Sequence, residues 1–348
     1  MITFFFNDHR IGGPHKQIYR YASLIKKKER TKFKYITPDF YYKKFFLKFR
    51  KYLFFFEIFF ITTFIIFNKK KIFNKNKTSI VLGIHNIAPI ISGYFLSKKT
   101  YWYIIEDVNL FSKILFGLIE KLFSPKIIFI SNFLRKKLNF KNYVYLPPYI
   151  KENKKLKINR SIKNTPDITC VGNINRLKGY DYLIKNMIDH RIDCKLEIIG
   201  KKLDTQNNLN NKIKELSLKY KNISNNEIIF SGFKNDNYIK SKLLVTDIYI
   251  LSSISEGSPN ALIEAMSYGC ICLASNVGGV SDIIKNNNNG FMFDIKKNNF
   301  FKIFKKILKL KSSEINNIKE NAVKTVSNNF ANKKYFLRFY KKIFNEQK

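Results

Sequence analysis

The sequence has few cysteines and histidines and lacks the commonest nucleotide and metal signatures. Its four cysteines, Cys170, Cys194, Cys270 and Cys272, have no CxxC spacing and fall in or beside apolar runs, so we expect reduced core residues. The four histidines show no metal-ligand spacing, which argues against a metal site. No GxGxxG, GxxxxGKS/T, HExxH or GxSxG pattern occurs, which removes the most easily recognised dinucleotide, phosphate-loop, zinc-protease and serine-hydrolase classes.

The distribution of apolar residues also predicts neither a secretory signal nor a membrane-spanning segment. The chain opens on a short apolar run that turns polar at once, so the cytoplasm is the default location. The longest apolar run, residues 53–67, has 15 residues. A helix of that length covers about 22 Å, short of a bilayer core of about 30 Å. We therefore expect no transmembrane helix.

Apolar and basic residues recur at helical spacing just upstream of that run. The apolar positions are Phe46, Phe49, Leu53 and Phe56, and the adjoining basic stripe is Lys44, Lys48 and Lys51. Two interpretations of this basic helix, residues 44–67, stay open. It lies on an anionic membrane surface, or it packs on the sheet of an α/β domain, which is the favoured alternative.

Acidic residues are scarce relative to basic ones. Asp and Glu number 25 against 64 Lys and Arg, a net charge of +39, which favours an anionic partner. A bias toward the codons of an AT-rich genome explains part of this charge equally well. The lysines are spread along the chain and no nucleic-acid module is recognisable, so we do not favour nucleic acid as the partner.

With 45% hydrophobic and 16% aromatic residues, the chain is not disordered.

Apolar β-branched runs alternate with helix-period segments along the whole chain, which predicts parallel α/β sheets. Strands are expected at residues 2–6, 33–37, 79–83, 101–105, 127–130 and 143–146, and again at 168–172, 196–200, 228–232, 248–251 and 271–274. A charged stretch at residues 151–164 separates the two series and is the expected linker. The sequence therefore predicts two similar α/β halves, followed by helices from residue 298 onward.

The most informative stretch is residues 247–279. After the strand at 248–251, Ser258 is suited to cap a helix, Pro259 to its first position and Gly269 to its end. The backbone N–H groups of about residues 259–262 are then expected at a helix N-terminus, where phosphate binds well. Glu256 and Glu264 flank this anion site, and sugar hydroxyls are natural donors to such carboxylates.

These residues resemble the retaining glycosyltransferases of family 4, also called glycosyl transferases group 1. The family mark is Glu-x7-Glu with an Ala-Met/small-Gly helix end, matched by Glu256, Glu264 and EAMSYG at residues 264–269. Similar text recurs nearly throughout, namely RIGGPHKQI (10–18), ISNFLRKKL (130–138), VGNINRLKGYDYLI (171–184), LEIIGKK (196–202), FSGF (230–233) and GGVSDII (278–284).

The resemblance implies a glycosyltransferase-B architecture, with two Rossmann-like doubly wound domains facing a cleft. Residues 1–155 would bind the acceptor, residues 156–330 the nucleotide-sugar, and residues 331–348 would form a helix packing back on the first domain. The implied activity is retaining, metal-independent transfer of a hexose from a UDP- or GDP-sugar, without a further cofactor. The acceptor would be a glycan or lipid-linked molecule of cell-surface polysaccharide or lipopolysaccharide biosynthesis, with the enzyme peripheral on the inner face of the plasma membrane.

On the donor side, the resemblance implies that Glu256 contacts the sugar, Glu264 holds the ribose hydroxyls and Lys178 grips the diphosphate. The family usually has an Arg where this chain has Asn173, so Arg176 is expected to substitute. The expected nucleotide-binding residues are Gly12, Gly13, Arg176, Lys178, Ser258, Pro259, Asn260, Ala261, Leu262 and Glu264. Gly12 and Gly13 follow the first strand, where a phosphate can approach the backbone closely; a plain turn is the alternative.

On the acceptor side, many relatives place a His-Asp pair near the reacting centre. Here Glu106 and Asp107 occupy that place, so Asp107 joins Glu256 and Lys178 as an expected catalytic residue, whereas His85 is expected to be structural. Two alternatives remain. One is a non-enzymatic basic protein that binds nucleic acid or an anionic polymer. The other is an epimerase or phosphorylase of the same fold.

Overall fold

The computed structural model describes most of the chain as two compact units, which divide between Tyr149 and Ile150. The described residues are 2–5, 16–21, 23, 33–36, 54–73, 78–83, 86–108, 110–140, 143–151, 161–203, 206–224 and 226–331. The predicted helix at residues 331–348 therefore lies outside the described residues, apart from Ala331.

The first unit is built on six parallel strands in the order β2-β1-β3-β4-β5-β6. They are β1 (Ile2–Phe5), β2 (Phe33–Ile36), β3 (Thr78–Leu82), β4 (Lys99–Ile104), β5 (Lys126–Phe129) and β6 (Tyr143–Tyr145). β3 is buried along its whole length, as expected of a parallel strand with helices on both sides. All six predicted strands of this half are present, each within two residues of its predicted bounds.

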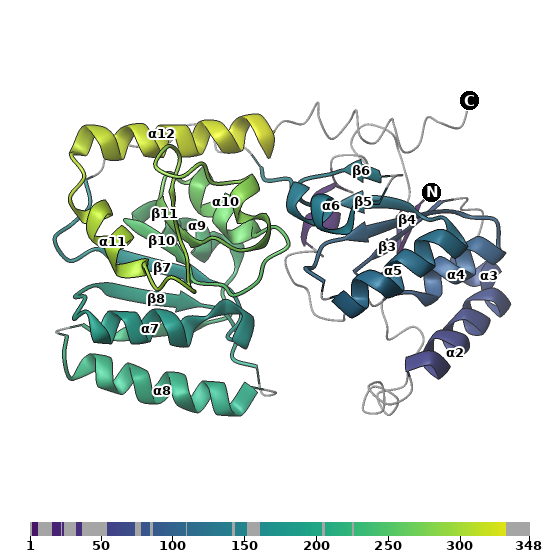
Figure 1. The fold of residues 1–348 in the computed structure, drawn as a ribbon, viewed down its shortest axis with the longest axis horizontal. Coiled ribbons are helices and arrows are strands. Elements are labelled where there is room, and N and C mark those ends of the chain that lie inside the picture. The colour runs from purple at the N-terminus through teal and green to yellow at the C-terminus, as the bar shows by residue number, and fades with distance from the viewer. Residues whose placement is uncertain are drawn as a thin grey trace. The chain divides into compact units, whose positions relative to one another are not determined.

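The described part of the first unit also contains helices α2 (Phe54–Phe67), α3 (Lys69–Phe73), α4 (Ala88–Phe95), α5 (Leu110–Phe123) and α6 (Asn132–Leu138), and residues 16–21 are helical. α2 and α5 each contact α4, so these three helices form one layer (Figure 1). The buried Trp102 of β4 anchors this layer, because its ring meets Phe116 of α5 edge-on at 4.9 Å. α2 buries Ile61 and Ile65 in the unit, as the packing interpretation expects; residues 44–53 lie outside the described part of the chain.

No helix within the described ranges combines the length and the apolar character needed to cross a bilayer. α2, the most apolar of them, has 14 residues.

The second unit also has six parallel strands, in the order β12-β11-β10-β7-β8-β9. They are β7 (Asp167–Val171), β8 (Lys195–Ile199), β9 (Ile228–Gly232), β10 (Ile248–Leu251), β11 (Ile271–Ser275) and β12 (Phe291–Phe293). This is the doubly wound order of a dinucleotide-binding sheet. The five predicted strands are present, and the bounds of β10 agree with the prediction. β12 was not predicted, since three residues are too few to show a strand pattern.

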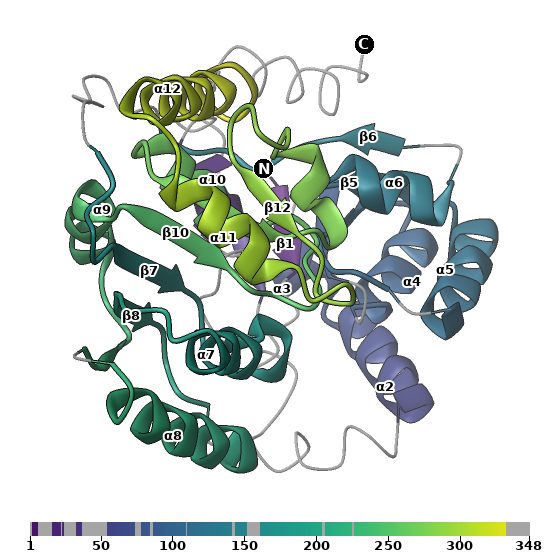
Figure 2. The same cartoon turned by 60° about the vertical axis from the view of Figure 1, so that its left-hand side comes forward.

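Its helices are α7 (Tyr180–Asp189), α8 (Asn207–Lys221), α9 (Asp236–Val245), α10 (Asn260–Ser267), α11 (Phe300–Leu308) and α12 (Ser312–Asn329). α7, α8 and α11 share one core, α9 and α10 share another, and α12 contributes to both, so the sheet is covered on both faces (Figure 2). All four cysteines are buried with free thiols, which confirms the expectation of reduced core residues. Burial raises the pKa of Cys194 to about 12, so this thiol is inert at neutral pH.

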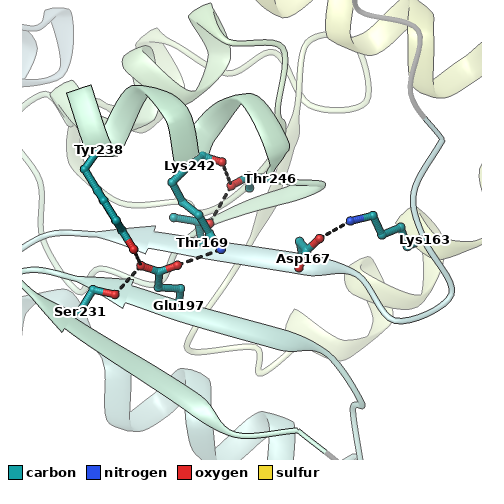
Figure 3. A network of polar contacts seen from close by, with 8 residues as sticks. All are labelled: Lys163, Asp167, Thr169, Glu197, Ser231, Tyr238, Lys242 and Thr246. Atoms are coloured by element: carbon teal, nitrogen blue, oxygen red, sulfur yellow. Dashed lines mark hydrogen bonds and ion pairs between the residues drawn. The ribbon is translucent and has the colours of Figure 1, made fainter. Parts of the chain in front are cut away.

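A buried carboxylate, for which the sequence predicted no role, lies at the centre of β8, the strand next to the edge strand β9 (Figure 3). Glu197 of β8 accepts hydrogen bonds from the hydroxyls of Tyr238, at 2.7 Å, and of Ser231, while Lys242 of α9 lies 2.8 Å from its other oxygen. Burial alone would raise the pKa of Glu197. The bonds from Lys242, Ser231 and Tyr238 outweigh burial, and the pKa lies below its ordinary value of 4.5.

Candidate active site

The winding of the second sheet reverses between the neighbouring strands β7 and β10. Loops that leave the carboxyl ends of two such strands diverge, and ligands of doubly wound sheets bind in the space between them. The loop after β7 carries the short 3₁₀ turn η3 (Arg176–Lys178), and the loop after β10 carries Glu256 and leads into α10. Residues 78 positions apart in the sequence therefore meet at this corner.

A lysine and a glutamate from these two loops form an ion pair. Nζ of Lys178 lies 2.6 Å from Oε1 of Glu256, and the hydroxyl of Ser253 donates to the same oxygen at 2.6 Å. The side chains of Lys178 and Glu256 are 24% and 12% exposed, so the pair is held in place and still open to solvent. The structure thus brings together two of the three expected catalytic residues. Ser253 was not identified from the sequence.

Backbone contacts fix the loop that carries Lys178 against the end of β10. The hydroxyl of Ser252 donates to the carbonyl of Lys178 at 2.8 Å, and the N–H of Ile254 donates to that of Leu177 at 2.7 Å. Gly179 has φ +60°, and a Cβ there would lie 2.2 Å from the carbonyl oxygen of Ser252. Only glycine permits this close approach.

A second glycine, Gly278, packs closely against the backbone of Glu256. Gly278 begins the 3₁₀ turn η5 (Gly278–Asp282), has φ +52°, and would place a Cβ 1.6 Å from the carbonyl oxygen of Glu256. The N–H of Gly279 donates to the same carbonyl at 3.2 Å. The GGVSDII text that resembled the family thus has a physical function, since it positions the backbone of Glu256. The sequence alone did not reveal this contact.

The start of α10 differs by one residue from the prediction. Pro259 is extended, with ψ 99°, and its carbonyl accepts the first intrahelical bond, from Ile263 at 3.3 Å. Pro259 is therefore the cap and Asn260 the first helical residue, so the expected capping role of Ser258 is wrong. Proline also has no N–H, which means that the anion-binding donors of this helix start at Asn260 and not at Pro259.

The other residues expected along α10 have different environments. Asn260 and Ala261 are half-buried in the first turn, whereas Leu262 is fully buried and can reach a ligand only through its backbone. Glu264 is half-buried in the second turn. Gly269 has φ +68° just past the helix, and the N–H of Cys270 donates to the carbonyl of Ala265 at 3.2 Å, which confirms the predicted glycine stop.

Arg176 and Asn173 lie in the same loop as Lys178 and do different things. Arg176 is exposed, and within the described ranges its side chain makes no ion pair. Asn173 accepts a hydrogen bond from the N–H of Lys201 at 3.1 Å, so it ties this loop to the end of β8. The expected substitution of Arg176 for the missing family arginine stays a prediction.

The acceptor-side residue Asp107 belongs to the first unit and follows β4. Its Oδ1 lies 2.6 Å from Nζ of Lys137 on α6 and accepts the N–H of Val108 at 2.8 Å. Glu106 is half-buried beside it. Gly12, Gly13 and His85 lie outside the described residues, so their expected roles stay predictions.

Across the described ranges, no three His, Cys, Asp or Glu side chains gather in a way that would ligate a metal ion. The independence from metal implied by the resemblance stays a prediction.

Two parallel six-stranded α/β units form the architecture of the glycosyltransferase-B class, and solved structures of that class align with 99% of this chain. The sequence profile of the glycosyl transferases group 1 family matches residues 151–325, half of the chain. The chain belongs to this family.

Curated relatives match different lengths of the chain. Two uncharacterized glycosyltransferases of Methanocaldococcus jannaschii are 32% identical over 141 and 200 residues, which is 39% and 56% of this chain. The chain covers only 34% and 48% of these two proteins. Protein CapJ of Staphylococcus aureus is 26% identical over 322 residues, 81% of this chain and 78% of its own length.

Among solved structures, HepE of Anabaena in complex with UDP and glucose aligns with 99% of both chains, at a TM-score of 0.75 and 12% identity. At this identity the likeness concerns the fold.

Proposed function

We propose that the protein is a retaining, metal-independent glycosyltransferase that moves a hexose from a UDP-sugar to a glycan or lipid-linked acceptor. The observation that carries the proposal is the Lys178–Glu256 pair, fixed at the winding reversal of the second sheet and followed by the N-terminus of α10. This corner combines a cation, a carboxylate and helix N–H donors, which are the groups that a sugar diphosphate needs.

The chemistry follows from where charge develops. Breaking the bond between the anomeric carbon and the diphosphate leaves the electron pair on the diphosphate oxygen. The ammonium group of Lys178 and the N–H groups at the start of α10 would stabilise that charge. Glu256 would accept hydrogen bonds from the sugar hydroxyls and Glu264 from the ribose hydroxyls.

The donor and acceptor classes have separate support. HepE has the same fold and binds UDP, which favours a UDP-sugar over a GDP-sugar. The net charge of +39 favours an acceptor that carries phosphate groups or sits in an anionic membrane, as a lipid-linked saccharide does.

The proposal is tested first by nucleotide binding. Thermal shifts of the purified protein are measured with UDP, GDP, ADP, CMP and dTDP, without added metal and with EDTA. A ligand at about 100 times its Kd adds about 2.7 kcal/mol to stability, a readily measured shift. We expect UDP to stabilise the wild type and not Glu264→Ala. The matched control is Glu215→Ala, which removes an exposed glutamate of α8 and should leave the UDP shift unchanged.

Product analysis then tests the reaction. The expected product is a glycoside whose anomeric configuration matches that of the donor, formed only with acceptor present. A sugar-nucleotide altered without acceptor would identify an epimerase instead. Salt-sensitive binding to duplex DNA, with no response to any nucleotide, would support the basic binding protein and overturn the proposal.

A further inference from the structure

The first unit exposes an unusual number of large apolar side chains on neighbouring helices. The Phe–Leu surface consists of Phe59, Phe60 and Phe67 of α2, Tyr94 and Phe95 of α4, and Leu110, Ile114, Leu118 and Leu122 of α5. Each is more than half exposed. Single exposed apolar residues are ordinary, but a group on adjoining helices marks an interaction surface.

α5 shows the pattern most clearly. Leu110, Ile114, Leu118 and Leu122 follow one another at intervals of four, so they lie along one side of the helix, and they are 53% to 74% exposed. The other side of the helix buries Phe116 and Ile119 in the core. A surface helix of a soluble protein normally presents polar residues on its open side, so a row of four exposed large apolar side chains indicates a surface suited to an apolar environment.

Exposed apolar side chains occur on all three neighbouring helices α2, α4 and α5. α2 and α5 both contact α4 and lie beside it in one layer (Figure 1). Tyr94 of α4 meets Phe123 of α5 at 5.5 Å, which joins the exposed end of α4 to that of α5. The exposed apolar side chains therefore occur on all three helices of the layer and are not confined to one helix.

Basic residues accompany the apolar ones. Lys113 and Lys121 are exposed on α5 among its leucines, and Lys69, Lys70 and Lys71 are exposed directly after α2. Glu120, the one acidic residue of α5, is half-buried at the edge of the exposed side. Lysine is depleted from protein–protein interfaces, whereas Lys mixed with Phe and Leu is the composition of helices that lie on anionic lipid.

We propose that the Phe–Leu surface docks the first unit on an anionic membrane, with its apolar side chains at the boundary between headgroups and acyl chains and its lysines on the lipid phosphates. The charge of the surface selects lipid over a second copy of the chain, because two copies would bring the same lysines together. The proposal takes up the membrane interpretation of residues 44–67, which the sequence favoured less than packing on the sheet, and extends it to α4 and α5. It does not depend on the proposed sugar transfer.

Vesicle binding by the full chain tests the proposal directly. Flotation is measured with vesicles of phosphatidylglycerol and phosphatidylethanolamine, and with neutral phosphatidylcholine vesicles, in the absence of any sugar-nucleotide. We expect the wild type to bind the anionic vesicles at least tenfold more tightly than the neutral ones. Equal binding to both, or binding to neither, overturns the proposal.

A matched pair of variants assigns the binding to this surface. Leu118 of α5 and Leu218 of α8 are 53% and 58% exposed, and Leu218 also lies on a lysine-rich helix, but in the second unit. Leu118→Glu should weaken vesicle binding about tenfold or more, while Leu218→Glu should change it less than twofold. Equal losses in both variants would show that the added negative charge, and not this surface, is responsible.

Three further measurements separate the remaining explanations. Lys113→Gln and Lys121→Gln should each weaken binding about fivefold at low salt, and less at high salt. Sedimentation without lipid should give a monomer for both the wild type and Leu118→Glu. A wild-type dimer that Leu118→Glu dissociates, with unchanged vesicle binding, would identify the Phe–Leu surface as a dimer interface instead. Glu256→Gln should bind vesicles normally, which distinguishes this proposal from the proposed sugar transfer.

Discussion

Among the described residues of the second unit, two lysine–glutamate pairs are largely buried and of nearly equal length, but they serve different purposes. Lys242 and Glu197 are 2.8 Å apart, and Lys178 and Glu256 are 2.6 Å apart. The first pair lies in the middle of a strand, where Tyr238 and Ser231 satisfy the same carboxylate. The second lies past the carboxyl ends of two strands, in loops. Burial does not separate the two kinds of pair, but position relative to the carboxyl edge of the sheet does.

A third pair, Lys137 and Asp107, lies in the first unit and is also 2.6 Å long. It joins a loop to a neighbouring helix and is more open, with side chains 35% and 24% exposed. The three pairs therefore predict three different responses to mutation.

The largest effect is expected from removing the charge of the pair at the strand ends. Glu256→Gln should lower kcat for sugar transfer by about 10² to 10³-fold, the usual cost of losing one preorganised polar group at a reacting centre. Its melting temperature should stay close to that of the wild type. Steady-state kinetics and thermal unfolding measure both. An equal loss in Glu215→Gln, on the surface of α8, would contradict the assignment.

Breaking the pair in the middle of the strand should lower stability and leave the rate of sugar transfer unchanged. Lys242→Met leaves Glu197 buried without its cation, which costs about 3 to 5 kcal/mol of stability. The folded fraction should transfer sugar at the wild-type rate. Urea unfolding measures the stability, and Lys240→Met is the control, since Lys240 is exposed on the same helix α9. Similar losses in both lysine variants would mean that the buried pair contributes little.

A glycine pair tests how the backbone holds Glu256. Gly278→Ala forces a Cβ against the Glu256 carbonyl at positive φ, so it should cost about 1 to 3 kcal/mol and weaken UDP binding. Gly117→Ala is the control, because no atom lies within 4 Å of a Cβ on that residue of α5. It should raise stability by about 0.5 to 1 kcal/mol. If Gly278→Ala changed neither stability nor UDP binding, the backbone at this contact would have to shift at little energetic cost.

The lowered pKa of Glu197 predicts a pH dependence. A carboxyl whose pKa is lower in the folded state stabilises the protein above its unfolded pKa, and this contribution disappears as the pH falls through the folded pKa. Stability should therefore decline below about pH 4.5, the ordinary value for Glu. Glu197→Gln should show a shallower decline when melting is measured from pH 7 to pH 3. Identical slopes would contradict this reasoning.

The smallest effect on stability is expected from the third pair. Asp107→Asn and Lys137→Met break the same partly exposed ion pair, so each should change stability by less than about 1 kcal/mol. If Asp107 is catalytic, Asp107→Asn should lower kcat about tenfold while Lys137→Met lowers it less. Equal kcat values in the two variants would limit Asp107 to a structural role.

Local sequence determined much of the fold. Runs such as TSIVL and IYIL are apolar and β-branched, so they form buried parallel strands within a residue or so of the predicted bounds. Gly269 ends α10 because its left-handed conformation is set locally. The three-residue strand β12 and the exact start of α10 escaped prediction, because a short run and a Ser-Pro pair each fit more than one local structure.

Tertiary structure decided which polar residues work together. Lys178 and Glu256 were both named from the sequence, but their contact, the support from Ser253 and the need for Gly179 and Gly278 depend on loops that only the sheet brings together. The Glu197 network and the exposure of the leucines of α5 likewise depend on how distant segments pack. Strand and helix propensity act over a few neighbouring residues, whereas ion pairs, close backbone approaches and exposed faces depend on where distant segments pack. The sequence by itself therefore determined the elements and the family resemblance, and the packing of those elements decided the geometry of the site.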